Sequence, residues 1–336
     1  MAAELVPSDK IEISGIIEVE AQSFRKKFIY DPNNSEEKTE SDSDITLATI
    51  EVGIDAEINP SIQGHVLFLW EEDETEEFDD FLDEATITVS NPEKCNYYFT
   101  AGKMYLPFGS FESNFVIDPM TLEVAEINQT AIRIGHKKGF TDISFGFFNG
   151  DVEKIDKDNE INSFFANASI AYSHDQFNMN LGLSYLSNMA DTENMQAVMN
   201  PDGVNEYTQG MGVFFRTDMD TWYFSAEYLA TTENFDPGQF DPNETAVEVV
   251  NHIRPETYNL EFGLKTRDKA CLALKYERAD DLNLLDLPEE RFGVCLSYSL
   301  YDDVLLSLEY LREKFDKPNV NKDKNDIVTA QLAIAF

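Results

Sequence analysis

Hydrophobic and polar residues alternate strictly along many short segments of this chain. From position 177 to position 185, Phe, Met, Leu, Leu and Tyr alternate with Asn, Asn, Gly and Ser. Positions 258–265 and 292–300 repeat this arrangement with other residues. Because successive side chains of a β-strand point to opposite faces, a period of two predicts strands with one apolar and one polar face.

The alternation recurs from end to end and predicts an all-β protein of about sixteen strands, or about fourteen if one pair is merged. No glycine- or proline-rich linker interrupts it, so we expect residues 1–336 to form a single domain. The predicted strands are 9–24, 43–58, 61–72, 80–91, 95–104, 129–138, 140–150, 161–173, 176–187, 207–217, 221–231, 248–266, 269–279, 290–300, 303–313 and 325–336.

Short and long connections alternate between these strands. This is the plan of a transmembrane, antiparallel, up-and-down β-barrel of the bacterial outer membrane, with short periplasmic turns and long extracellular loops. An even number of strands places both termini on the periplasmic side. The expected short turns are 59–60, 91–94, 139, 173–176, 218–220, 266–269 and 301–302. The expected long loops are 25–42, 73–79, 105–128, 151–160, 188–206, 232–247, 280–289 and 314–324.

A soluble β-sandwich or β-helix is the alternative fold. A sandwich rarely needs so many strands, and the chain has no apolar run of about 18 residues that would make a transmembrane helix. Many aromatic residues of the apolar face lie near strand ends, where amphipathic rings mark membrane interfaces, although a soluble core also buries aromatic rings. These residues are Tyr172, Phe177, Tyr185, Phe215, Trp222, Tyr228, Tyr258, Tyr276, Tyr298 and Tyr310.

Composition changes this picture in three ways. The formal net charge of -39 argues against nucleic acid as a partner, while 12% aromatic residues argue against disorder. The expected macromolecular surroundings are outer-membrane lipid and lipopolysaccharide, and an oligomer is possible. Three cysteines show no metal spacing, so free thiols are expected, with a Cys271–Cys295 bridge as the alternative. The final alternating segment stops at Phe336, which resembles the recognition signal of outer-membrane barrels.

The segment from Tyr105 to Asn128 is too apolar for a freely solvated loop. It contains several large apolar side chains, and its two prolines, Pro107 and Pro119, interrupt strand pairing. A barrel of about sixteen strands is wide enough to leave an aqueous channel that such a loop can enter. We therefore expect this loop to fold into the lumen and form the constriction. The alternative is an outside loop that packs on a neighbouring subunit.

This segment also carries a motif. It begins with Gly102-Lys103-x-Tyr105-x-Pro107-Phe108-Gly109, continues with Phe111-Glu112, and ends with Asp118-Pro119-x-Thr121-Leu122-Glu123. The motif resembles that of the LbtU-type siderophore porin family, and the surrounding barrel pattern extends the resemblance over nearly the whole chain. Of that family's second acidic motif, only Glu126 matches here. The resemblance implies an outer-membrane barrel that takes up a ferric siderophore without an energised plug.

The strand pattern agrees with the absence of a plug. Energised receptors have about 22 strands and a plugged lumen, whereas the alternation here begins near Ile11 and leaves no N-terminal plug. We expect an outer-membrane channel for a ferric siderophore or a similar small solute. The alternatives are a general diffusion porin that prefers cations and, less favoured, an outer-membrane barrel enzyme such as a phospholipase.

Strand parity predicts which charged residues face the lumen. Acidic residues of the first strands and basic residues of later strands lie partly opposite each other, which would set up a transverse field that selects solutes by charge, unless these charges pair with their neighbours. The acidic set is Glu12, Glu18, Glu20, Glu51, Asp55, Glu57 and Glu84, and the basic set is Arg133, Arg216, Lys265, Lys275 and Arg291. The predicted constriction and substrate residues are Lys103, Tyr105, Phe108, Phe111, Glu112, Asp118, Glu123, Arg133, Arg216, Lys265 and Arg291.

Other chemistry has little support in the sequence. The four histidines show no metal-ligand spacing, so we expect no metal site and no cofactor. His136 and His174 fall beside predicted periplasmic turns, which does not suit a Ser-His-Asp hydrolase. No catalytic residue is predicted.

Overall fold

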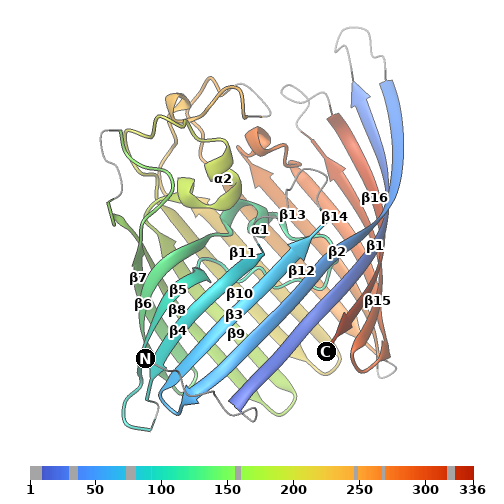
Figure 1. Ribbon diagram of the computed structural model, residues 1–336. Coiled ribbons are helices and arrows are strands. Elements are labelled where there is room, and N and C mark those ends of the chain that lie inside the picture. Colours follow the sequence, from blue (N-terminus) through green and yellow to red (C-terminus); the bar gives the residue numbers. More distant parts are fainter. Residues whose placement is uncertain are drawn as a thin grey trace.

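The computed structural model is a closed barrel whose described residues form sixteen antiparallel strands (Figure 1). It describes residues 10–29, 37–72, 81–91, 93–155, 160–245, 249–266, 269–315 and 322–336. Every strand pairs with its neighbours in sequence, and the first strand closes the ring against the last. The predicted sixteen-stranded barrel is therefore confirmed, and the count of fourteen is wrong.

The described strands are β1 (Ile11–Ile29), β2 (Glu37–Asn59), β3 (Ile62–Glu71), β4 (Leu82–Ser90), β5 (Tyr97–Tyr105), β6 (Asn128–Lys138), β7 (Thr141–Phe148), β8 (Ser163–His174), β9 (Phe177–Leu186), β10 (Gly210–Met219), β11 (Trp222–Thr231), β12 (Glu256–Lys265), β13 (Ala270–Asp280), β14 (Glu290–Tyr301), β15 (Val304–Lys314) and β16 (Lys322–Ala335). Short helices interrupt the loops: α1 (Met120–Ala125), η2 (Met189–Asp191), α2 (Glu193–Ala197), η3 (Pro237–Gln239) and η4 (Asn283–Leu285).

Two strand boundaries differ clearly from the prediction. The hairpin of β1 and β2 projects well beyond the rest of the barrel, because the polar residues 37–44 still pair with β1 (Figure 1). Strand β12 begins at Glu256 and not at 248, since Pro255 cannot donate to a ladder and Ile253 bonds to Phe235 of another loop. The predicted loop residues 73–79 and 156–159 and turn residues 267–268 lie outside the described residues.

The two faces of each strand differ as the alternation predicts. On β9, Leu181 and Leu183 point outward and are 37% and 58% exposed, whereas the next residue, Ser184, points into the barrel and is 4% exposed. Apolar side chains that point outward into lipid are favourable, and polar ones there are costly. Rings gather near both ends of this outer face, as in the pairs Tyr172–Phe177 and Phe164–Tyr185.

The closing seam joins β1 to the end of β16. Gly15 and Phe336 exchange two backbone hydrogen bonds of 2.9 and 3.0 Å. A Cβ atom at Gly15 would lie 2.5 Å from the Phe336 ring, so a glycine is needed where this ring lies against β1. The terminal aromatic residue thus packs on the first strand of the barrel.

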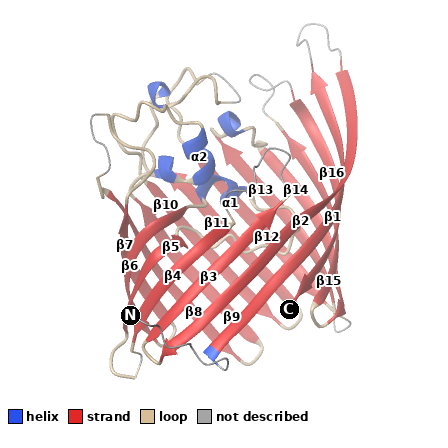
Figure 2. Cartoon of the chain, in the orientation of Figure 1, coloured by secondary structure: helices blue, strands red, loops and turns tan. Residues whose placement is uncertain are grey.

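The helices gather toward the end of the barrel opposite to both termini (Figure 2). No helix among the described residues is long and apolar enough to cross a membrane. At the end of the barrel where the helices gather, the long loops cover part of the opening. Their apolar side chains form one buried cluster with inward-facing residues of β7, β8, β9 and β11. By the porin convention this end is extracellular and the end with the termini is periplasmic.

Candidate functional site

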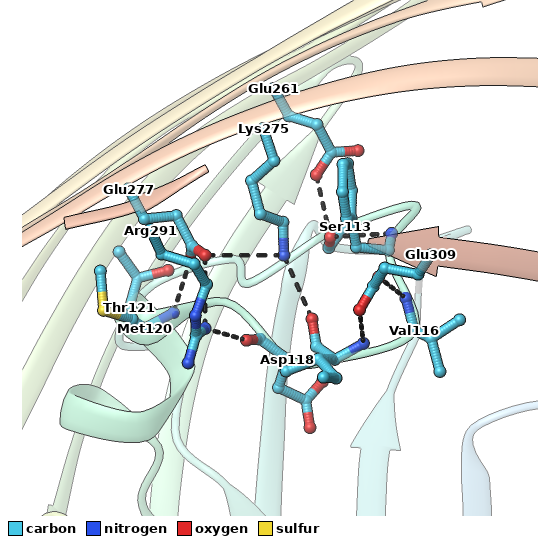
Figure 3. A network of polar contacts seen from close by, with 12 residues as sticks. Ser113, Val116, Asp118, Met120, Thr121, Glu261, Lys275, Glu277, Arg291 and Glu309 are labelled. Carbon is cyan, nitrogen blue, oxygen red and sulfur yellow. Dashed lines mark hydrogen bonds and ion pairs between the residues drawn. The ribbon is translucent and has the colours of Figure 1, made fainter. Parts of the chain in front are cut away.

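The inner loop, residues 106–127 between β5 and β6, runs inside the barrel. Around the ring, β13 lies eight strands from β5, so it stands on the opposite wall. The loop reaches that wall, where its side chains and backbone bond to β11, β12, β13, β14 and β15 (Figure 3). The prediction that this loop folds into the lumen is confirmed, and an outside loop packed on another subunit is wrong.

Apolar side chains hold one flank of the inner loop. Phe108 and Met120 are fully buried, and Leu106, Val124 and Ile127 are at most 5% exposed. They belong to a cluster that also contains residues of β7, β8 and β9 and of the segment 189–199, which includes η2 and α2. Protein therefore fills the extracellular part of the lumen between the loop and the wall of β7, β8, β9 and β11.

Four carboxylates of the opposite wall bind the polar side of the inner loop; we call them the anchoring carboxylates. Glu227 on β11 accepts hydrogen bonds from the backbone amides of Ser110 at 2.6 Å and Phe111 at 3.1 Å, and from the Thr121 hydroxyl at 3.0 Å. Glu227 is only 6% exposed. Two of these donors are backbone amides of residues outside any described helix or strand, where no ladder or helical bond satisfies them.

The second anchoring carboxylate is Glu261 on β12. It accepts from the Asn114 amide at 2.9 Å and the Ser113 hydroxyl at 2.8 Å (Figure 3). The Tyr223 hydroxyl donates at 2.5 Å to Oε1, the same oxygen that accepts from the Asn114 amide.

The remaining two anchoring carboxylates lie on β15 and β13. Glu309 accepts from the Val116 amide at 2.7 Å, and Glu277 accepts from the Met120 amide at 2.7 Å (Figure 3). The four anchors together fix the loop over residues 110–121. Backbone amides bound by these four carboxyl groups make the loop a fixed part of the lumen wall.

Two cations of the same wall bind the loop's carbonyl groups. Lys275 Nζ donates to the Ile117 carbonyl at 3.1 Å, and Arg291 donates to the Asp118 carbonyl at 3.0 Å (Figure 3). Arg291 also pairs with Glu277 and Glu313, at 3.3 and 2.8 Å. These buried cations are thereby neutralised and do not present free positive charge to the channel.

The Asp118 carboxylate is the charged group that the inner loop leaves open to the lumen. Among the described residues it has no hydrogen-bond or ion-pair partner, although its own carbonyl is bound by Arg291. Surrounding protein raises the pKa of Asp118, against the opposing effect of Lys275 and Arg291. Asp118 and Glu18 of β1 repel each other electrostatically, so the loop and the β1 wall face each other with like charge.

A second carboxyl group follows at the end of the loop. Burial raises the pKa of Glu126 to about 8, and repulsion from Glu193, Asp118 and Asp83 adds to the shift. Glu193 begins α2, where its amide donates to the Glu126 carbonyl at 3.0 Å. The mouth of the channel therefore contains a carboxyl group that titrates near neutral pH.

Comparison with known proteins finds distant relatives in sequence. No family model matches the chain. A UPF0422 protein of Coxiella burnetii is 22% identical over 299 residues, which is 85% of this chain and 61% of the relative. UPF0422 protein lpl2888 of Legionella pneumophila is 23% identical over 307 residues, or 83% of this chain and 56% of the relative. The chain thus spans little more than half the length of these curated relatives.

Solved structures similar to the chain are outer-membrane channels. The channel DcaP of Acinetobacter baumannii has a TM-score of 0.61 and 15% identity, with 99% of this chain and 100% of that chain covered. OmpF of Salmonella typhi, in complex with daunomycin, has a TM-score of 0.64 and 12% identity, with 98% and 99% covered. An anion-selective porin of Comamonas acidovorans has a TM-score of 0.61. The chain has the fold of an outer-membrane porin.

Several residues predicted for the constriction do meet at the inner loop. Glu112 pairs with Arg216 at 3.0 Å, and Arg291 binds the loop at Asp118. Glu123 accepts from Asn194 at 3.1 Å, and Phe108 and Phe111 pack within the apolar cluster.

Other predicted residues lie elsewhere. Lys103 donates to the Leu82 carbonyl and Tyr105 to Asp83, so both contact the rim of β4 and not the loop. Strand alternation puts them on the face opposite to the lumen-facing Met104. Lys265, at the periplasmic end of β12, pairs with Asp218 at 2.5 Å.

These contacts correct the expectation of a transverse field between an acidic and a basic wall. Arg216, Lys265, Lys275 and Arg291 each pair with a carboxylate, so the pairing alternative applies to them. Arg133, in the middle of β6, has no ion pair among the described residues. The acidic wall remains, with Glu12 and Asp55 exposed to the lumen.

The anchoring role of Glu227, Glu261, Glu277 and Glu309 was not predicted from sequence. Strand parity places Glu227, Glu261 and Glu309 in the lumen, but parity does not show what they bind. The missed signal is that an irregular apolar loop in a lumen needs acceptors for its backbone amides. The three cysteines are free thiols, as expected, and no group of side chains in the described ranges is arranged to hold a metal ion.

Proposed function

We propose that this chain forms a passive solute channel in the bacterial outer membrane and that the inner loop is its constriction. The observation that carries the proposal is the anchoring of residues 110–121 to β11, β12, β13 and β15 inside a barrel of sixteen strands. An unplugged barrel of this size leaves an aqueous lumen, and a fixed loop narrows it. Lipid and lipopolysaccharide are the partners that the exposed apolar outer face suits.

The open part of the lumen supports a preference for cations. Protein fills the extracellular part of the lumen between the loop and the wall of β7, β8, β9 and β11, so the passage beside the loop runs along β1 to β4. That wall carries Glu18, Glu51 and Asp55, and Asp118 faces it from the loop. Rings of carboxylates favour cations in a pore, and the nearby basic residues are already paired.

Reversal potentials in planar bilayers across a KCl gradient test this proposal. A unit charge acts on an ion about 6 Å away in water with roughly 0.7 kcal/mol, attracting K⁺ and repelling Cl⁻ by the same amount, so Asp118→Asn should lower the K⁺/Cl⁻ permeability ratio about tenfold. Asp175→Asn removes the same charge in an exposed periplasmic turn and should leave the ratio unchanged. A folded protein that conducts no ions, or one that prefers chloride, would overturn the proposal.

A ferric siderophore is the more specific candidate solute. What supports it is that residues 107–109, 111–112 and 118–123, which carry the resemblance to LbtU-type porins, lie in or beside the constriction. Single-channel recordings with added ferric siderophores of different chemistry distinguish a selective pore from a general one. A selective pore gives interruptions that saturate with concentration, whereas a general porin gives none for any of them.

A further inference from the structure

A pocket of about 410 Å³ lies in the inner wall at the periplasmic end of β4, β5, β6 and β7. The inner loop leaves β5 at the other end, so this pocket is separate from the constriction. We propose that it binds the carboxylate or phosphate group of a solute that leaves the channel. The residues that carry the proposal are Tyr98, Arg133, Lys137 and Asp142, with the thiol of Cys95 beside them.

The Tyr98 ring forms a fixed wall of the pocket. It lies flat over Gly135 on the next strand, where a Cβ atom would come within 2.0 Å of the ring. The Tyr98 hydroxyl reaches across to β7 and donates to Asp142 at 2.9 Å. This hydrogen bond fixes the position of the ring and engages one oxygen of the Asp142 carboxylate.

Arg133 lies over this ring, with its guanidinium carbon 5.3 Å from the ring centre. Its Nε is buried and has no hydrogen-bond partner, and no described carboxylate pairs with it. A buried guanidinium N–H without a partner is unfavourable. A second arginine, Arg216 on β10, lies over a tyrosine in the same way, on Tyr223 of β11. Unlike Arg133, Arg216 has an ion-pair partner, Glu112.

The charge and shape of the pocket favour an oxyanion. Arg133 and Lys137 oppose the single carboxylate of Asp142, which gives a positive spot in a chain of formal charge -39. A guanidinium that lies over a ring presents a planar fork of N–H groups, which matches carboxylate and phosphate oxygens. The paired hydroxyls of Thr88 and Thr100, 2.9 Å apart, line the same wall and offer further hydrogen bonds.

Cys95 provides a reporter inside the pocket, because it is an exposed free thiol. The folded full-length protein is treated with an anionic sulfonatoethyl or a cationic trimethylammonioethyl methanethiosulfonate. Peptide mass mapping separates Cys95 from Cys271 and Cys295. We expect inorganic phosphate and succinate, at constant ionic strength, to slow the anionic reagent at Cys95, and whichever protects better identifies the preferred group.

Matched variants connect this protection to the two cations. Arg133→Gln and Lys137→Gln should abolish it and should each lower the ratio of anionic to cationic reaction rates about tenfold, the equivalent of one charge-assisted hydrogen bond of about 1.4 kcal/mol. Lys138→Gln removes the same charge one residue along, on the opposite face of β6, and should retain protection. Absence of protection by either anion, or equal protection in Lys137→Gln, would overturn the proposal.

Discussion

The Tyr223 hydroxyl donates to the Glu261 carboxylate at 2.5 Å, and the same carboxylate holds the inner loop at Ser113 and Asn114. The ring that carries this hydroxyl lies over Gly263, where a Cβ atom would come within 1.9 Å of it. A glycine on β12, a tyrosine on β11 and the position of the loop are thus linked by direct contacts.

Loss of this hydroxyl should loosen the loop. Tyr223→Phe removes one hydrogen bond to a charged group, so we expect the free energy of unfolding to fall by about 1.5–3 kcal/mol and the open-channel current noise to rise. Gly263→Ala should act in the same direction by displacing the ring. Tyr185→Phe is the control, because that hydroxyl has no hydrogen bond among the described residues. Equal stability of Tyr223→Phe and the wild type would contradict this coupling.

Deletion of residues 108–124 should raise the single-channel conductance severalfold, as expected for a wide lumen without its constriction. The measurement requires a folded barrel, which slowed mobility of the unboiled protein on gels establishes. Unchanged conductance in a folded deletion variant would show that the narrowest point lies elsewhere.

The channel should respond to pH through Glu126, whose pKa is about 8 in the folded protein and near 4.5 when unfolded. Between these values the folded state holds a proton that the unfolded state has lost, so stability falls as pH rises through this window and is constant above it. Ionisation of Glu126 near pH 8 also adds negative charge to the mouth, so cation preference should increase there.

Glu126→Gln should remove the part of both effects that is centred near pH 8, as measured by urea unfolding and by reversal potentials between pH 6 and 9. Asp191, whose pKa burial raises to about 7, still titrates in the variant. The free energy of unfolding changes by at most about 1.4 kcal/mol per pH unit for each group. Glu206→Gln, which changes an exposed extracellular carboxylate, should leave both profiles as in the wild type. A Glu126→Gln profile that matches the wild type would assign the response to another group.

The fold could be predicted from sequence because membrane and lumen impose opposite demands on successive residues. Leu183 meets lipid and Ser184 meets the interior, and this difference repeats at every second position. The predicted strand ends were less accurate outside the membrane-spanning part of the barrel. Residues 37–44 extend β2 beyond the apolar band without alternation. Pro255 ends a strand ladder that the residue pattern alone extends to position 248.

The site was predictable only in part, for a related reason. Parity identifies Glu227 and Glu309 as lumen residues, but it does not tell which carboxylate is open to solute and which accepts hydrogen bonds from the loop. The role of each carboxylate depends on the path of residues 110–117 across the lumen. This path brings together residues that are more than 100 positions apart in the sequence. Arg133 was expected opposite the loop's acids, yet in the middle of β6 it lies over the Tyr98 ring and pairs with none of the described carboxylates.

The membrane position of the barrel itself is open to a direct test on β9. Leu181 points outward at mid-strand, so Leu181→Arg should cost about 2–4 kcal/mol of unfolding free energy, because a guanidinium at the bilayer centre loses its hydration. Asn180 precedes it and points inward, beside Arg216 on β10, so Asn180→Arg keeps the new charge in lumen water and should cost much less. Urea titrations in lipid vesicles measure both. Equal destabilisation of the two variants would mean that the outer face of β9 does not contact lipid.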